Sequence, residues 1–343
     1  MNDFNVLFIC CGMHVKERID SLRYNEDGAK IKVFAANCER NNLPPGDMAD
    51  GAFVVPKIND KEYLPTILSI CKKHDIKIIV PTVTLELNSM AENRSYFEKE
   101  GIRVSIASPE SLAIANDKIK LHGLFGDLMP QEIVPSSIEE VHAFKETLPS
   151  CSSICCKLSN HCGGNGFAIV DNGKSLDMSL FNKYGGNHYI SMEQLDLLLR
   201  RKEYKIIVQE YKEGYDYSVS VLTVNGDVTH ICGYIGYEMS CGAITNGQIL
   251  YNKAAYSIAK RLCKELKLDG NACFDFRLSA TGDVTLLEIN PRVNASLPFV
   301  RKAGCNMLYL RCKNLLGDYS DLHHDDEIKY GLRMKKYQDS KYY

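Results

Sequence analysis

Two carboxylates and an amide recur at short spacing in the segment NACFDFRLSATGDVTLLEINPRVNASLP, residues 271–298. Two runs typical of β-strands flank a Thr-Gly turn, which predicts a β-hairpin. If that turn is two residues long, Asp275 lies opposite Glu288, because both are equally far from its centre. Alternation along the strands then places Glu288 and Asn290 on one face. The apolar residues take the other face, namely Phe274, Phe276, Leu278, Leu287 and Ile289.

Two acids that share one face of a buried hairpin repel each other unless a cation or a proton lies between them. Ligands made only of oxygen suit Mg²⁺, which takes one or two carboxylates and completes its shell with phosphate oxygens and water. We therefore interpret Asp275, Glu288 and Asn290 as candidate metal ligands. Arg292 adds a donor fork that suits phosphoryl charge. The alternative interpretation is a solvated hairpin face with an incidental acid pair.

A second candidate site is the segment KLSNHCGGNGF, which begins at Lys157 and predicts a strand, a glycine-rich loop and a returning strand. The glycines at positions 163, 164 and 166 allow backbone N–H groups to close over phosphates. Lys157 supplies a positive charge beside them. The alternative interpretation of Gly163, Gly164 and Gly166 is an ordinary hairpin turn.

A third candidate site lies at the end of an apolar strand predicted at residues 205–211. This strand ends in acidic residues, and a glycine and then Asp216 follow. Backbone at a strand end can bind an adenine edge, and an acid beyond it can bind ribose hydroxyls. An ordinary charged turn is the alternative interpretation.

The N-terminal third of the chain alternates short β-branched runs with helical stretches, which predicts a Rossmann-like domain with a parallel sheet between helices. We expect strands at 6–10, 31–35, 52–55, 76–80 and 104–106, and helices near 61–74 and 85–100. The first strand runs into Cys11-Gly12-Met13-His14 and lacks the glycine pattern that binds dinucleotides, which argues against an NAD-dependent dehydrogenase. The crevice at the carboxyl ends of the strands is a candidate site for part of a substrate.

A second domain is predicted to start between residues 107 and 116, and a length of 343 residues suits two or three packed units. We expect helices near 109–126, 138–148 and 251–266, strands at 153–158, 168–170 and 205–211, and hairpins at 217–235 and 272–290.

Composition limits the partners. The 41 basic and 43 acidic side chains give a formal net charge of -2, which creates no field for nucleic acid or a membrane surface. The 14 cysteines lie scattered in apolar runs without a CxxC pair, which indicates reduced thiols. The chain begins without a signal-peptide pattern and has no apolar run of the roughly 18 residues that span a bilayer, so we expect a cytoplasmic protein.

Taken in order, these segments resemble the ATP-grasp superfamily, in particular the synthetase halves of carbamoyl-phosphate synthase large subunit and related carboxylate–amine ligases. The motifs that carry the resemblance are Asn116-Asp117-Lys118, the Lys157 strand with its glycine loop, Gln209-Glu210-Tyr211, and Glu288-Ile289-Asn290-Pro291-Arg292. The implied fold mixes α/β and α+β architecture. A Rossmann-like pre-ATP-grasp domain spans 1–108, and a two-lobed ATP-grasp domain spans 109–320, with a small lobe at about 150–211, a large lobe at about 212–320 and a polar C-terminal tail at 321–343.

The resemblance also implies roles for the site residues. Lys118 and Lys157 contact the nucleotide phosphates together with the glycine loop, and Asp216 takes the ribose position. The adenine contacts are Gln209, Glu210, Tyr211 and Lys212. The metal ligands are Asp275, Glu288 and Asn290, and the catalytic residues are Arg292 and Lys157.

The implied activity is that of an ATP-dependent ligase, which forms an acyl phosphate from a carboxylate and couples it to an amine with release of ADP and phosphate. The cofactors are ATP and Mg²⁺, with Mn²⁺ as a substitute, and the partners are small molecules, with a homodimer as the default assembly. Two alternatives stay open: a carboxylase that acts through carboxyphosphate, and a slow ATP-binding regulatory module. Leu158, His161 and Asn165 depart from the family pattern, and residues 237–248 lack an arginine that many relatives carry, so the acceptor does not follow from the resemblance.

Overall fold

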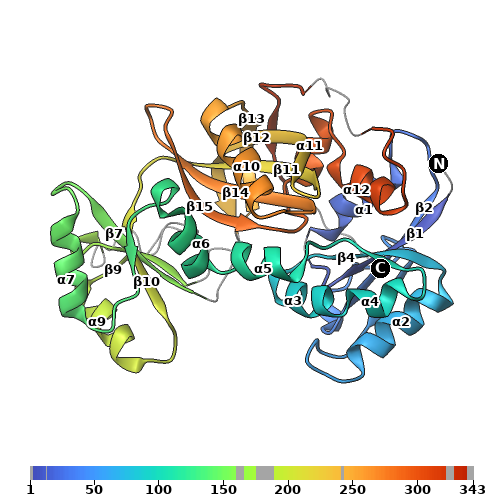
Figure 1. The fold of residues 1–343 in the computed structure, drawn as a ribbon, viewed down its shortest axis with the longest axis horizontal. Helices are drawn as coiled ribbons and strands as arrows, with labels where there is room; N and C mark the ends of the chain where they lie inside the picture. Colours follow the sequence, from blue (N-terminus) through green and yellow to red (C-terminus); the bar gives the residue numbers. More distant parts are fainter. Residues whose placement is uncertain are drawn as a thin grey trace.

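The computed structural model describes residues 3–12, 14–159, 166–174, 189–240, 243–321 and 328–337. Three sheets form its framework, and each belongs to a different part of the molecule (Figure 1). The first sheet lies in an N-terminal domain, the second in a small lobe at the opposite end, and the third in a large lobe beside both. Within the described residues, no helix is long and apolar enough to span a membrane.

The sheet of the N-terminal domain has five parallel strands in the order β3-β2-β1-β4-β5. They are β1 (Phe4–Ile9), β2 (Ile31–Asn37), β3 (Gly51–Val54), β4 (Ile76–Pro81) and β5 (Arg103–Val104). The central strands are runs of apolar residues because both of their faces are covered. From β1 the strand order runs through β2 and β3 on one side and through β4 and β5 on the other. The carboxyl ends of β1 and β4 therefore form a switch point. The parallel sheet confirms the predicted fold class.

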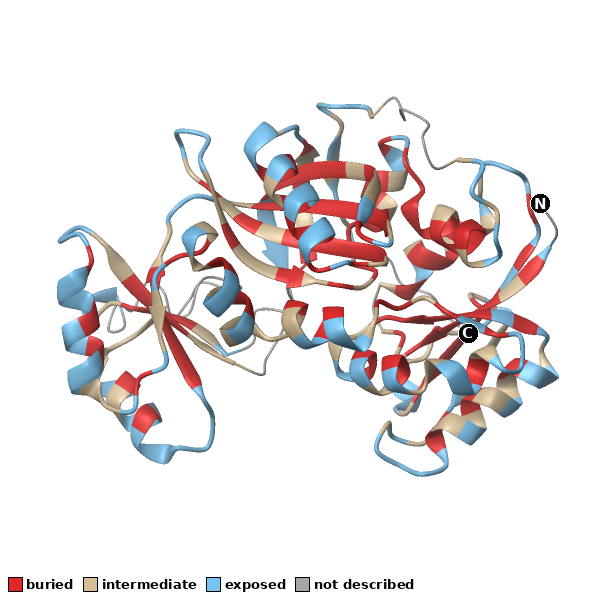
Figure 2. Ribbon diagram, viewed as in Figure 1, coloured by how far each residue is buried: buried red, intermediate tan, exposed pale blue. Residues whose placement is uncertain are grey.

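Helices cover both faces of this sheet, and Figure 2 shows buried strands between partly exposed helices. One face packs against α1 (Val15–Arg23), α11 (Leu297–Lys302) and α12 (Met307–Leu315). The other packs against α2 (Tyr63–Lys73), α3 (Thr84–Glu92) and α4 (Arg94–Glu98). The helix α1 is not predicted from the sequence, although Val15, Ile19 and Leu22 have helical spacing. Because α11 and α12 come late in the chain, the N-terminal domain shares its core with C-terminal residues.

The small lobe contains a five-stranded sheet in the order β6-β10-β7-β8-β9. Its strands are β6 (Glu132–Ile133), β7 (Ser153–Leu158), β8 (Phe167–Val170), β9 (Tyr189–Ile190) and β10 (Ile206–Tyr211). The helices α7 (Ile138–Thr147) and α9 (Met192–Arg201) cover one face, where Cys156 and Val208 pack. Because side chains alternate along a strand, Cys155, Lys157 and Gln209 point to the opposite, uncovered face.

The large lobe contains a six-stranded antiparallel sheet in the order β15-β14-β11-β12-β13-β16. Its strands are β11 (Tyr215–Val224), β12 (Asp227–Ser240), β13 (Ala243–Ile249), β14 (Gly270–Leu278), β15 (Val284–Asn290) and β16 (Arg333–Lys335). The helices α5 (Pro109–Ala115), α6 (Lys118–Phe125) and α10 (Lys253–Glu265) cover its outer face. Asn225 and Gly226 join β11 to β12 with positive φ angles of 51° and 91°, as a two-residue hairpin turn requires. Two 3₁₀ segments, Arg40–Asn42 and Gly126–Leu128, complete the described elements.

Part of the segment assigned from the sequence to a polar tail, residues 321–343, is a strand. β16 pairs with β13 at the edge of the large-lobe sheet. Lys336 then pairs with Glu17 of α1, with 3.1 Å between Nζ and Oε2. Residues 328–337 of the predicted polar tail therefore pack against both the large lobe and α1. The short polar strand carries no pattern of its own, because it is stabilised by pairing with a partner distant in sequence.

Candidate active site

A cleft of about 550 Å³ lies between the N-terminal domain, the small lobe and the large lobe. Most of the residues selected from the sequence line it, namely Lys118, Lys157, Gln209, Glu210, Tyr211, Lys212, Asp216, Asp275, Glu288, Asn290 and Arg292. Gly166 is described but does not line the cleft, and Gly163 and Gly164 lie outside the described residues. Segments far apart in the sequence therefore converge on one cavity.

The hairpin of β14 and β15 places Asp275 opposite Glu288, as predicted. The connection between the strands is longer than the predicted two residues and spans 279–283. A β-bulge compensates, because the pairing shifts by one residue directly after the acid pair and leaves Leu287 as the extra residue. Leu286 consequently packs in the core, whereas Leu287 lines the cleft. The prediction that Leu287 faces the core is wrong for this reason.

The acid pair belongs to a hydrogen-bonded network at the base of the cleft. Asp275 accepts hydrogen bonds from Ser218 Oγ at 2.7 Å and from Asn290 Nδ2 at 2.8 Å. Asn290 Nδ2 also donates to Glu288 Oε1 at 3.1 Å. Lys118 Nζ lies 3.0 Å from Glu288 Oε2. Each acid therefore has a partner that favours its charged form.

The two acids nevertheless ionise differently. Burial and the negative charge of Glu288 raise the pKa of Asp275 to about 6. Burial also opposes ionisation of Glu288, but the charge of Lys118 and the hydrogen bond from Asn290 outweigh it and lower the pKa of Glu288. The pair gains its second negative charge as the pH rises through about 6, and a cation then has two carboxylates to bind.

The donor atoms of Asp275, Glu288 and Asn290 fit a hard divalent cation, because two carboxylates and an amide offer only oxygen ligands. Among the residues that the structure describes, no three His, Cys, Asp or Glu side chains form a metal cluster. A cation at this position would therefore take its remaining ligands from phosphate oxygens and water. In the structure the amide nitrogen of Asn290 faces both acids, and its oxygen accepts from Arg292 Nη2 at 3.3 Å.

Lys157 lies on the small-lobe wall, in a network that was only partly predicted. Its Nζ donates to Gln209 Oε1 at 3.2 Å and lies 3.7 Å from Glu132 Oε2, while Gln209 Nε2 donates to Glu132 at 2.9 Å. The side chains of Lys157 and Glu132 are 13% and 4% exposed. Burial lowers the pKa of Lys157 and raises that of Glu132, and their attraction opposes both shifts. Glu132 was missed because a two-residue strand has no sequence signal.

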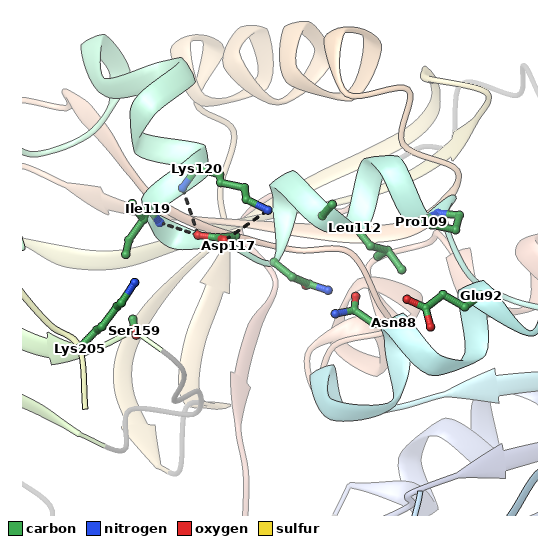
Figure 3. A pocket seen from close by; sticks show the side chains of 11 residues that line it. Asn88, Glu92, Pro109, Leu112, Asp117, Ile119, Lys120, Ser159 and Lys205 are labelled. Atoms are coloured by element: carbon green, nitrogen blue, oxygen red, sulfur yellow. Dashed lines mark hydrogen bonds and ion pairs between the residues drawn. The ribbon is translucent and has the colours of Figure 1, made fainter. Parts of the chain in front are cut away.

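Lys118 reaches the acid pair from the first turn of α6. Asp117 is the N-cap of this helix and accepts hydrogen bonds from the backbone amides of Ile119 and Lys120, each at 3.1 Å (Figure 3). This cap fixes where α6 begins and therefore where Lys118 leaves the helix. In the motif Asn116-Asp117-Lys118, Asp117 therefore caps the helix and Lys118 lines the cleft.

The charged residues at the end of β10 and the start of β11 form ion pairs with nearby side chains in the wall of the cleft. Lys212 Nζ donates to Glu210 Oε1 at 2.7 Å. Asp216 pairs with Arg277 Nη1 at 3.1 Å, and its side chain is 36% exposed. Tyr211 and Leu287 add apolar surface to the cleft. The cleft wall therefore combines apolar groups with acids that are each paired to a basic side chain.

Gly166 lies at the base of the β7–β8 hairpin. Its φ angle of 72° favours glycine, and a Cβ atom there would lie 2.8 Å from the side chain of Leu158. The described part of the glycine-rich segment therefore requires glycine for the turn itself. The predicted contact of Gly163 and Gly164 with phosphates falls outside the described residues.

Arg292 is held where the large lobe meets the N-terminal domain. Its Nε donates to Thr84 Oγ1 at 3.3 Å, and its Nη1 donates to the carbonyl of Val293 at 3.2 Å. Asn294, in the same loop, is buried and donates to Ser220 Oγ at 2.8 Å. The loop after β15 is thus tied to both domains, which fixes the direction of the Arg292 guanidinium.

The switch point of the N-terminal sheet forms another wall of the same cleft. Cys10 and Gly12 follow β1, Thr82 and Val83 follow β4, and all four line the cavity. Thr82 Oγ1 donates to the carbonyls of Ile9 and Cys10, at 2.9 and 2.8 Å, which joins the two strand ends. Beside them lie His14 and Arg18, neither of which was selected as a site residue. Neither residue was predicted from the sequence, because the position of both depends on α1.

A second cavity of about 480 Å³ lies where α3, α5 and α6 meet the small lobe (Figure 3). Asn88, Glu92 and Asp117 line it from one side, and Ser159 and Lys205 from the other. None of the described residues selected from the sequence as site residues lines this cavity. The chemistry expected from the motifs therefore belongs to the larger cleft.

Comparison with protein families gives two matches. The family described as "PylC-like, N-terminal domain" matches residues 6–105. The family described as "ATP-grasp in the biosynthetic pathway with Ter operon" matches residues 202–340. A search of the curated proteins finds no match.

Solved structures of low sequence identity share the fold. The chain is similar to the biotin carboxylase domain of 2-oxoglutarate carboxylase from Hydrogenobacter thermophilus, with a TM-score of 0.68 and 15% identity over 96% of this chain and 73% of that chain. The chain is also similar to N5-carboxyaminoimidazole synthetase from Staphylococcus aureus, with a TM-score of 0.64 and 12% identity over 92% of this chain and 78% of that chain. For L-amino acid ligase from Bacillus licheniformis, the TM-score is 0.60 and the identity 14%, over 92% of this chain and 75% of that chain. The predicted resemblance to the ATP-grasp superfamily is confirmed: residues 6–105 match a PylC-like N-terminal domain, residues 202–340 match an ATP-grasp family model, and solved structures share the fold.

Proposed function

We propose that the protein is an ATP-dependent ligase that activates a carboxylate as an acyl phosphate and couples it to an amine. The observation that carries this proposal is the acid pair Asp275 and Glu288 at the base of a cleft that also contains Lys118, Lys157 and Arg292. Acids that bind a cation and basic groups that bind phosphates are what a magnesium–nucleotide complex needs. The ATP-grasp match and the relatives crystallised with ADP support this nucleotide.

The metal site would be made by Asp275, Glu288 and Asn290, with Mg²⁺ as the ion and Mn²⁺ as a substitute. When bound, the ion would offset the negative charge of the phosphate oxygens. Lys118, which pairs with Glu288 in the structure, would then turn to the phosphates. Lys157 and Arg292 stabilise the charge on the phosphoryl group as it moves to the carboxylate.

The nucleoside would lie between the small and large lobes. The end of β10, residues 209–212, supplies backbone groups for adenine, and Tyr211 and Leu287 supply apolar contacts. Asp216 would accept hydrogen bonds from the ribose hydroxyls. Gln209 contributes less through its side chain, because both ends of its amide already bind Lys157 and Glu132.

In the second step the amine attacks the carbonyl carbon of the acyl phosphate. A carbon–nitrogen bond forms, the bond from carbon to the bridging oxygen breaks, and phosphate leaves as the amine loses a proton. The chain needs no nucleophile for this chemistry. Its contribution would be to hold the reactants between the lobes and to exclude water.

A second candidate is an ATP-dependent carboxylase, in which bicarbonate takes the place of the carboxylate and carboxyphosphate forms. The observation that favours it is the similarity to a biotin carboxylase domain with MgADP and bicarbonate and to N5-carboxyaminoimidazole synthetase. Both candidates use the same cleft and release ADP and phosphate. Their substrates are small molecules, and a homodimer is the default assembly for such an enzyme.

Oxygen transfer distinguishes the two candidates. Once a substrate pair is known, we expect an ¹⁸O-labelled carboxylate to transfer one labelled oxygen to inorganic phosphate, because the acyl phosphate forms through that oxygen. Turnover that requires bicarbonate, with label passing from bicarbonate to phosphate, would establish the carboxylase instead. ATP binding without turnover on any substrate would favour a regulatory module.

A further inference from the structure

Arg18 is a buried charge for which the described residues provide no ion pair within 4 Å and no hydrogen bond to Nε. It lies on α1, lines the cleft and is 6% exposed. Its Nε is shielded from solvent and has no hydrogen-bond partner in the part of the chain that the structure describes. The neighbouring acid, Glu17, pairs instead with Lys336 at 3.1 Å. An unpaired guanidinium in such a place destabilises the fold unless an opposite charge lies beside it.

The surroundings of Arg18 favour an anion. Burial and the positive charge of Arg292 lower the pKa of Arg18 to about 10, so the two guanidinium groups lie within electrostatic reach of each other. Two like charges that converge on one cavity are stabilised when a negative group lies between them. Both side chains line the same cleft, Arg18 from the N-terminal domain and Arg292 from the large lobe.

The first turn of α1 adds to this field. His14 occupies the N-cap position and makes no side-chain hydrogen bond to the helix. His14 and Gly12 line the cleft, so the positive end of the helix dipole lies beside it. Burial, and then the charges of Lys336 and Arg18, lower the pKa of His14, which keeps its ring neutral near pH 7. The positive charge at this wall therefore comes from Arg18.

We propose that Arg18 and the N-terminus of α1 bind an oxyanion, a carboxylate or a phosphate ester, of the substrate that is not the nucleotide. This proposal rests on the ligase function proposed above and narrows its substrate class. The site lies at the switch point of the N-terminal sheet, and Arg292, which donates to Asn290, lies within electrostatic reach of Arg18. A substrate anchored there by its anionic group can present its reacting group to the phosphoryl group beside Arg292.

The test measures anion binding to the full chain while the nucleotide site is filled. The protein is first titrated calorimetrically with magnesium and a non-hydrolysable ATP analogue. Inorganic phosphate and succinate are then titrated separately into the saturated complex at constant ionic strength, so that neither probe can occupy the nucleotide phosphate positions. We expect one or both probes to bind the wild type. Phosphate alone would indicate a phosphate ester, and succinate alone would indicate a carboxylate.

The variant Arg18→Met removes the charge and keeps most of the side-chain volume. We expect anion affinity to fall about tenfold or more, and affinity for the ATP analogue to stay within about twofold. Arg18→Lys keeps the charge without the planar fork and should lie between the two. Arg23→Met is the matched control on the same helix, because Arg23 pairs with Asp50 at 2.7 Å outside the cleft. It should bind both probes like the wild type.

The outcomes separate this proposal from the proposed function. Failure of both anions to bind the wild type, or equal anion affinity in Arg18→Met, would overturn the anion site while leaving the ligase intact. Failure of the ATP analogue to bind would count against the ligase itself. If Arg18→Met loses its fold, Arg18→Lys provides the affinity comparison, and wild-type anion affinity in that variant would exclude recognition by the fork.

Discussion

Two walls face each other across the cleft, and the chain satisfies their polar groups to different extents. On the large-lobe wall, Asp275 accepts two side-chain hydrogen bonds from oxygen and nitrogen donors, and Glu288 pairs with Lys118. On the wall of the N-terminal domain, Arg18 is buried with an Nε that has no partner among the described residues. A satisfied network keeps its geometry with or without a ligand, whereas an unpaired buried charge is stabilised when an opposite charge binds.

This difference corresponds to two kinds of ligand. On the proposed function, the large-lobe wall is preorganised for a magnesium–nucleotide complex, because Lys118 already supplies a positive charge to the acids and Asn290 supplies hydrogen bonds. The other wall depends on a charge from outside, which would come from the specific substrate. Changes to the first wall should therefore impair turnover or stability, and removal of the charge from the second wall should impair only recognition.

The largest expected effect follows from Glu288→Gln, which removes a charge from the satisfied wall without changing the side-chain volume. We expect kcat to fall about 10³-fold, because the metal loses a carboxylate and the phosphoryl group its orientation. Turnover is measured as ADP release. The control Glu265→Gln removes an exposed acid that pairs with Arg261 at 2.8 Å, and it should retain full activity. Activity within about twofold of wild type in Glu288→Gln would contradict the metal assignment.

The second effect follows from Lys157→Met, which leaves Glu132 buried without its cation. We expect the free energy of unfolding to fall by about 3 kcal/mol, as measured by urea denaturation. The double variant Lys157→Met with Glu132→Gln should recover most of that loss, because no buried charge remains. ATP affinity should be about tenfold weaker in both variants. Wild-type affinity in the double variant would remove Lys157 from the nucleotide site.

The third effect concerns Asp275, whose pKa rises from 3.8 to about 6 in the folded protein. Because the folded state holds this proton more tightly than the unfolded state, the group stabilises the fold below about pH 4 and loses that contribution as the pH rises through 6. Without ligands, Asp275→Asn should exceed the wild type in stability at pH 7.5 by at most about 3 kcal/mol. The difference should shrink at pH 4.5.

Magnesium provides the check on this pH dependence. Saturating MgADP should stabilise the wild type more than Asp275→Asn at pH 7.5, because the cation offsets the repulsion that the variant has already removed. A stability difference that is the same at pH 4.5 and 7.5, with or without MgADP, would mean that Asp275 does not titrate in this range.

The smallest effect is the stability of Arg18→Met without ligand, which sharpens the contrast with Lys157→Met. Both variants replace a buried cation by methionine, but Lys157 has a buried acid partner and Arg18 has none within the described ranges. We expect Arg18→Met to unfold at the same urea concentration as the wild type or slightly above, with a gain of about 1 kcal/mol at most. A loss as large as that of Lys157→Met would show that Arg18 stabilises the fold and that its charge is compensated within the chain.

Local patterns predicted the large-lobe wall well. Alternation and a turn signal were enough to pair Asp275 with Glu288. The single helix expected near 109–126 is instead two helices, α5 and α6, because Asp117 caps a new helix start within it. The orientation of Leu287 was not predictable, because the bulge that turns it into the cleft depends on the five-residue connection between the strands. The pairing of residues within the hairpin was therefore predictable from their spacing. The orientation of Leu287 was not, because it depends on the β-bulge.

The other walls depend on contacts between distant segments, and the sequence does not show these directly. Glu132 reaches Lys157 because β6 lies beside β10 in the small-lobe sheet, although several helices and strands separate the two in the sequence. Arg18 lines the cleft because α1 packs against α11 and α12 from the end of the chain. β16 is a strand because β13 offers it an edge. Each of these positions is set by tertiary packing, which a short segment does not encode alone.

The most direct test of the central claim is ADP release from MgATP in the presence of pooled amino acids, amines and carboxylates, with Glu288→Gln as the control. We expect release that requires one carboxylate and one amine together and that is lost in the control. Deconvolution of the active pool would then name the product. Nucleotide binding without ADP release in every pool, or release that Glu288→Gln retains, would contradict the assignment of the cleft as a ligase active site.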